Sequence, residues 1–65
     1  MCLSKVYLGE KNDAKIIIEE ATKIRDNNGT VEIYSIFEES SKQKGYYIKE
    51  VDLMDNYIIL ERRGI

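Results

Sequence analysis

The residue with the most distinctive chemistry in this sequence is Cys2, the only cysteine in a chain that contains no histidine. It follows the initiator methionine directly, so removal of Met1 leaves a thiolate, a free α-amine and a nearby backbone amide close together. A soft thiolate combined with nitrogen donors suits Ni(II) or Cu(II) in square-planar geometry. One chain offers too few such donors, whereas one thiolate and one nitrogen from each of two chains make four ligands around a two-fold axis. The alternative is that Cys2 is a small, partly buried apolar residue of the first strand.

Other chemistry is poorly represented. The sequence has no histidine, no glycine-rich phosphate loop and no Gly-x-Ser-x-Gly elbow. Its twelve acidic residues are scattered among ten basic ones, which is typical of a solvated surface. We therefore predict that the protein is not an enzyme.

The five tyrosines raise the possibility of base stacking, as in proteins that bind single-stranded nucleic acid. Tyr34 and Tyr57 lie in alternating strand-like runs, where tyrosine is favoured for structural reasons. The net charge is −2, the basic residues form no stripe, and Arg62 and Arg63 are too short a cluster to attract a phosphate backbone. A structural role for the tyrosines is the favoured interpretation, and nucleic acid is an unlikely partner.

The length of 65 residues predicts a single domain, residues 1–65, with a marginal hydrophobic core. A lone cysteine excludes an intrachain disulfide, and the absence of histidine excludes an ordinary one-chain zinc site. Self-association is the remaining source of stability, so we expect a homodimer. No apolar run approaches the roughly 20 residues of a membrane helix, and no signal peptide is apparent, which predicts a cytoplasmic protein that does not enter the membrane.

The sequence predicts that the elements that position Cys2 are mainly strands. Residues 2–8 alternate between two faces, and residues 9–13 have the composition of a turn. Residues 14–25 are ambiguous, because their apolar spacing also fits an amphipathic helix that Asp13 could cap. The consecutive isoleucines 16–18 favour a strand there.

The rest of the chain predicts hairpins. Residues 26–29, Asp-Asn-Asn-Gly, are a hairpin signal before the alternating run 30–37. The polar residues 38–45 are expected to form a surface loop, and residues 46–53 and 57–61 to form strands joined by a short turn. The predicted fold class is all-β, a small bent antiparallel sheet or SH3-like barrel of five to seven short strands.

The opening Met1-Cys2-Leu3-Ser4-Lys5-Val6-Tyr7-Leu8 resembles that of the CooT family of nickel-binding proteins, which begin with Met-Cys and a short strand. The resemblance continues in order and spacing through residues 20–24, 28–31, 35–38, 48–53 and 58–61. It implies a homodimer of small β domains that binds one Ni(II) between its subunits through Cys2, as a chaperone or carrier for a nickel enzyme such as carbon monoxide dehydrogenase. Family members have also been described as RNA-binding on the basis of fold analogy, so an RNA-binding or protein-interaction module is the alternative function. The preference for nickel over copper or zinc is left open.

Overall fold

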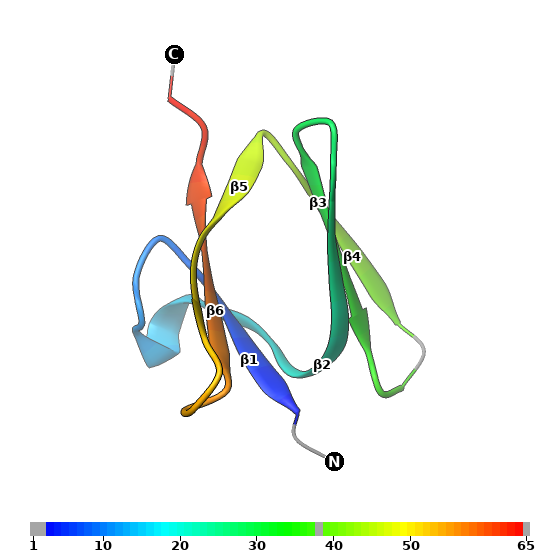
Figure 1. Ribbon diagram of the computed structural model, residues 1–65, viewed down its shortest axis with the longest axis vertical. Coiled ribbons are helices and arrows are strands. Elements are labelled where there is room, and N and C mark those ends of the chain that lie inside the picture. The colour runs from blue at the N-terminus through cyan, green and yellow to red at the C-terminus, as the bar shows by residue number, and fades with distance from the viewer. Residues whose placement is uncertain (1–2, 38, 65) are drawn as a thin grey trace.

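The computed structural model describes residues 3–37 and 39–64, which form one strongly bent six-stranded sheet and contain no α-helix (Figure 1). The strands are β1 Ser4–Leu8, β2 Ile16–Asn27, β3 Thr30–Ser35, β4 Ser40–Lys44, β5 Tyr46–Asp52 and β6 Tyr57–Arg62. Their order in the sheet is β4-β3-β2-β1-β6-β5. The predicted all-β class is confirmed. Within the described ranges, no helix has the length and apolar character that would let it cross a bilayer.

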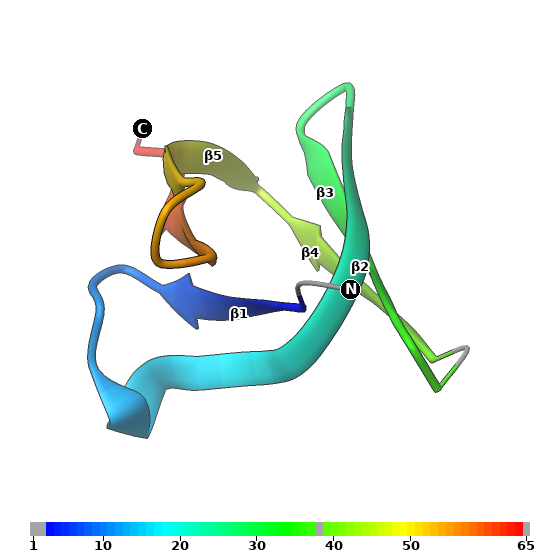
Figure 2. The same cartoon turned by 60° about the horizontal axis from the view of Figure 1, so that its bottom comes forward.

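Strand β2 is long enough to pair with a different neighbour at each of its ends. Its first part pairs with β1 and its second part with β3, and the pairing register shifts at Thr22. The Thr22 hydroxyl donates a hydrogen bond to the Tyr34 carbonyl at 3.3 Å, at the point where the extra residue of this β-bulge lets the strand turn. Figure 2 shows the resulting curve of β2. The choice of strand over helix is confirmed for residues 16–25.

A short 3-10 turn, η1 Asp13–Lys15, precedes β2. Asn12, and not Asp13, caps it, because the Asn12 side chain accepts a hydrogen bond from the backbone N–H of Ala14 at 2.9 Å. The predicted hairpin between β2 and β3 is present. Asn28 and Gly29 both have positive φ angles, 50° and 87°, as a two-residue turn of the I′ kind requires.

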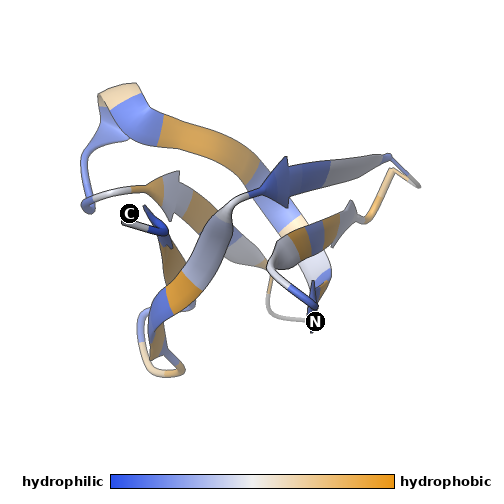
Figure 3. Ribbon diagram, turned by 90° about the horizontal axis from the view of Figure 1, so that it is seen from above, coloured by the Kyte–Doolittle hydropathy of each residue, from blue (hydrophilic) through white to orange (hydrophobic). Residues whose placement is uncertain are grey.

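The predicted loop over residues 38–45 is wrong, because Ser40–Lys44 forms strand β4 and pairs with β3 along its whole length. Figure 3 shows β4 as a hydrophilic strand. It lies at the edge of the sheet, where backbone pairing on one side is sufficient and charged side chains prevent pairing on the other. Polar composition therefore indicated exposure correctly and secondary structure incorrectly.

Gly45 is a corner that joins the two edge strands, β4 and β5. Its φ of +83° lies in the left-handed region that glycine tolerates. Its N–H donates to the Gly29 carbonyl at 2.9 Å, and its carbonyl accepts from the Arg63 N–H at 2.6 Å. These bonds join two turns and the C-terminal segment after β6 at one end of the molecule. The β4 and β5 strands do not pair with each other, so the sheet is open and is not the closed barrel that was one predicted alternative.

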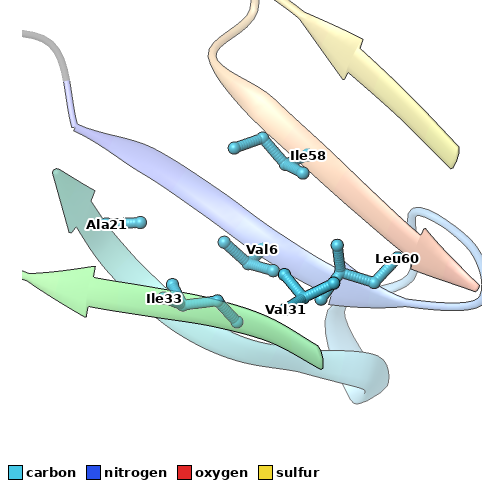
Figure 4. Close-up of a cluster of buried hydrophobic side chains, with 6 residues drawn as sticks. All are labelled: Val6, Ala21, Val31, Ile33, Ile58 and Leu60. Atoms are coloured by element: carbon cyan, nitrogen blue, oxygen red, sulfur yellow. The ribbon is translucent and has the colours of Figure 1, made fainter. Parts of the chain in front are cut away.

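The core lies inside the bend of the sheet. Six buried side chains from four strands meet there, as Figure 4 shows: Val6, Ala21, Val31, Ile33, Ile58 and Leu60. In the alternating run 30–37, Val31, Ile33 and Ser35 share one buried face, whereas Phe37 lies past the end of β3 and is 68% exposed. Tyr7 and Ile59 are buried on the opposite face of the same central strands.

Candidate functional site

Cys2, the predicted metal ligand, lies outside the described residues, so the site is built from the segment that follows it. Strand β1 is central in the sheet, antiparallel to β2 and parallel to β6. The parallel pairing was not part of the predicted antiparallel sheet. The backbone N–H of Lys5 donates to the Asn56 carbonyl at 3.0 Å. The start of β1 is therefore held against the turn between β5 and β6.

We call residues Asp52–Asn56 the β5–β6 tip. One oxygen of the Asp52 carboxylate accepts hydrogen bonds from the backbone N–H groups of Met54 and Asp55, at 3.0 and 2.8 Å. Asn56 closes the turn with a φ of 56°. This is an Asx turn, in which a short acidic side chain satisfies backbone donors that the sheet leaves unpaired.

The tip presents apolar side chains to solvent. Leu53 and Met54 are 85% and 89% exposed, more than the other large apolar side chains in the described part of the chain. Sequence reading placed a hairpin turn here but did not single out these two residues. The available signal was an apolar pair enclosed by the turn-forming residues Asp52 and Asn56, where polar side chains are the usual choice.

Tyr57, directly after the tip, lies among carboxylates. Its hydroxyl donates to Glu50 at 2.7 Å, and its ring meets that of Tyr7 edge to face, with centroids 6.2 Å apart. The hydrogen bond to Glu50, partial burial and the negative charges of Glu50, Asp52 and Asp55 raise the pKa of Tyr57 to about 12. The phenol therefore stays protonated at any physiological pH and serves as a fixed donor.

A second tyrosine–carboxylate pair joins β5 to β6. The Tyr47 hydroxyl donates to Glu61 at 2.7 Å, and Lys49 reaches the other oxygen of the same carboxylate at 3.4 Å. The bonds from Tyr47 and then Lys49 hold the pKa of the Glu61 carboxyl below its ordinary value. Glu61 is therefore a satisfied anion that links the two strands.

Three tyrosines share this arrangement of carboxylate and cation. Tyr34 donates to Glu32 at 3.2 Å. A cation lies over each ring: Lys11 over Tyr57 at 4.6 Å, Lys23 over Tyr34 at 4.8 Å and Arg63 over Tyr47 at 5.6 Å from the ring centroid. One face of each ring is thus occupied by a side chain of the chain itself. This arrangement favours the structural interpretation of the tyrosines over base stacking.

A hollow lies at the other end of β1 from Lys5. It has a volume of about 570 Å³, and its lining is mostly apolar, with Leu8, Ile16, Ile17 and Tyr46 among the lining residues. Metal-ligating side chains do not gather there or elsewhere: residues 3–37 and 39–64 contain no group of three or more His, Cys, Asp or Glu side chains placed to hold a metal ion.

Comparison with known proteins identifies the family. A family model described as CO dehydrogenase accessory protein CooT matches residues 1–61. The chain belongs to the CooT family. A search among curated proteins gave no match. Among solved structures, the CooT crystal structure from Carboxydothermus hydrogenoformans superimposes with a TM-score of 0.80 at 21% identity, covering 97% of this chain and 100% of that one.

The structural likeness shows that the CooT fold is shared. The family is described as accessory to carbon monoxide dehydrogenase, which is a supporting role and not the catalytic one. The resemblance drawn from the opening residues is therefore confirmed at the level of family and fold.

Proposed function

We propose that this protein is a nickel carrier for a nickel enzyme, with carbon monoxide dehydrogenase as its client, and that two copies of the chain hold one Ni(II) through Cys2. Membership of a family accessory to that enzyme is the observation that carries the proposal. Nickel is the cargo, and thiolate with nitrogen donors is the ligand set that suits it.

The donor inventory supports a shared site. The chain has one thiol and no imidazole, and the described residues contain no cluster of carboxylates that could hold a metal without Cys2. One thiolate per chain leaves a square-planar ion incomplete, whereas two chains supply two thiolates and two nitrogens. A homodimer also suits a small core and the unpaired edges of β4 and β5.

The decisive experiment is a nickel titration of the wild-type chain and of Cys2→Ser. Binding is measured by calorimetry and by the thiolate-to-nickel charge-transfer absorption. The wild type is expected to bind about one Ni(II) per two chains. Cys2→Ser is expected to lose tight binding and the absorption band, because a serine hydroxyl stays protonated near neutral pH and is a hard donor. Mass spectrometry establishes whether Met1 is present in each sample.

Met54→Leu is the matched control, because it removes an exposed thioether and leaves the thiol in place. It should bind nickel as the wild type does. Tight nickel binding by Cys2→Ser would place the ligands among the carboxylates and refute the proposal. So would an affinity that is unchanged below about pH 7, because a thiol of reference pKa ~8.5 must lose its proton before it coordinates.

Sedimentation of the metal-free protein tests the dimer separately. We expect a species of twice 7.6 kDa whose unfolding midpoint rises with protein concentration. A 7.6 kDa species with a concentration-independent midpoint would show that the metal-free chain is a monomer.

A further inference from the structure

The β5–β6 tip has the properties of a preformed contact surface. Leu53 and Met54 project into solvent from a turn that the Asp52 carboxylate holds with two backbone hydrogen bonds. Exposed apolar side chains contribute most to an interface when little conformational freedom is lost on binding. Because the turn is already ordered, its backbone loses little conformational entropy on binding, and the two apolar side chains are positioned before a partner arrives.

The charges around the tip define the partner's chemistry. Asp52 and Asp55 flank the apolar pair in the sequence of the tip. Glu50 accepts a hydrogen bond at 2.7 Å from Tyr57, the residue directly after the tip, so three carboxylates lie at this end of the hairpin. Of the neighbouring cations, Lys11 lies over the Tyr57 ring and Lys5 pairs with Tyr57 from strand β1. A complementary surface is an apolar pocket bordered by Lys or Arg side chains. A second copy of this chain fits less well, because a two-fold contact at the tip would set the same carboxylates against each other.

The position of the tip relates it to the proposed metal ligand. The Lys5 N–H bonds to Asn56, the last residue of the tip, and Lys5 follows Cys2 by three residues in the sequence. Figure 1 shows the start of β1 and the β5–β6 turn at the same end of the molecule. The other exposed apolar turn, at Ile36 and Phe37, belongs to β3 and β4 at the opposite edge of the sheet.

We propose that the β5–β6 tip is the docking surface for the enzyme that receives the metal, with Leu53 and Met54 entering an apolar pocket bordered by basic residues. This inference rests on the proposed function, because it assigns the client's contact to a surface that is hydrogen-bonded to Lys5, which follows Cys2 by three residues in the sequence. Docking there brings the donor segment to the client, so that the metal is transferred over a short path.

The test is direct binding between purified carbon monoxide dehydrogenase and variants of the full chain, measured by biolayer interferometry in low and moderate salt. The double variant Leu53→Ser/Met54→Ser should lose at least tenfold in affinity, because such central apolar contacts dominate interfaces. Asp55→Lys should lose several-fold in low salt, and less in moderate salt because ions screen exposed charges. Phe37→Ser and Glu10→Lys are the matched controls: each makes the same kind of change at another exposed position, and neither should change the affinity.

Each outcome has a definite meaning. Wild-type affinity in the double variant, or no binding of the enzyme by the wild-type chain, overturns the docking proposal. A double variant that sediments as a smaller species shows that a second copy covers the tip, which also overturns it. Nickel titration of the same variants separates the two proposals: all should bind nickel normally, whereas Cys2→Ser should lose nickel and still dock. A chain that docks through the tip but binds no nickel would refute the proposed function alone.

Discussion

The two ends of the bent sheet are built in different ways. At the Gly45 end, backbone hydrogen bonds join Gly29, Gly45 and Arg63, so two turns and the segment after β6 satisfy one another's polar groups. At the end that carries the β5–β6 tip, the turn satisfies its own donors through Asp52 and exposes Leu53 and Met54. Stability is concentrated at the first end and along the core, whereas the second is free to contact other molecules. Substitutions at the two ends should therefore have separable effects.

The largest expected effect on stability is that of Leu60→Ala in the core. Leu60 is fully buried, and its removal should lower the free energy of unfolding by about 2 to 5 kcal/mol, as for other large-to-small core changes. Urea denaturation followed by circular dichroism measures this. Leu53→Ala is the matched control at the tip, where the change should stay within about 0.5 kcal/mol. Similar losses for both would show that the tip belongs to the folded core.

Gly45→Ala should have the next largest effect. A Cβ at this position would meet nothing within 4 Å, so the cost comes from the φ of +83° alone. A residue with a side chain pays about 1 to 2 kcal/mol for the left-handed region. Gly64→Ala is the control, because it also meets nothing within 4 Å and has no positive φ. Equal midpoints of thermal unfolding for the two variants would mean that the backbone at residue 45 can leave the left-handed region at little cost.

Alkaline pH should weaken the β5–β6 hairpin near the tip. The folded pKa of Tyr57, about 12, lies above its ordinary value of 10, so the folded state keeps a proton that the unfolded state loses. The stabilisation is complete below pH 10 and is lost as pH rises towards 12. Absorbance at the tyrosinate band should show a late-ionising fraction that is smaller in Tyr57→Phe; it does not vanish there, because the hydrogen bond to Glu61 also raises the pKa of Tyr47. A late-ionising fraction of the same size in the wild type and in Tyr57→Phe would contradict the hydrogen bond to Glu50.

The smallest effect is expected from Lys49→Met. Lys49 and Glu61 are 3.4 Å apart with both side chains partly exposed, and such pairs contribute about 0 to 1 kcal/mol. The loss should shrink further in high salt. Tyr47→Phe removes the other partner of Glu61 and serves as the comparison. A salt-independent loss for Lys49→Met would indicate that its aliphatic chain matters through packing.

The local parts of the fold could be predicted from the sequence. Asn28-Gly29 specified its hairpin through residues that adopt positive φ, and the alternation of Val31, Ile33 and Ser35 specified a buried face. The isoleucines at the start of β2 favoured a strand in spite of helical spacing. In each case the decisive interaction lies within a few residues of the signal.

The non-local parts could not be predicted. Strand β4 has no apolar face, so its identity depends on the β3 backbone beside it and not on its own side chains. The parallel pairing of β1 with β6 depends on residues from opposite ends of the chain. The candidate site divides in the same way: the prediction that Cys2 is a metal ligand comes from sequence chemistry alone and concerns a residue outside the described ranges, whereas the contact of Lys5 with Asn56 required the structure.

The central position of β1 also constrains how the protein folds. Its parallel partner, β6, is the last strand of the chain, so the register that sets Lys5 beside Tyr57 closes a loop of about fifty residues. Contacts of such separation form slowly, because the entropy of closing the loop is lost before any packing is gained. During synthesis the first strand is made at the start and receives this neighbour only after the final hairpin is complete. A ribosome-bound chain that ends before β6 should therefore remain sensitive to protease, and a chain in which β6 has also left the ribosome should become resistant.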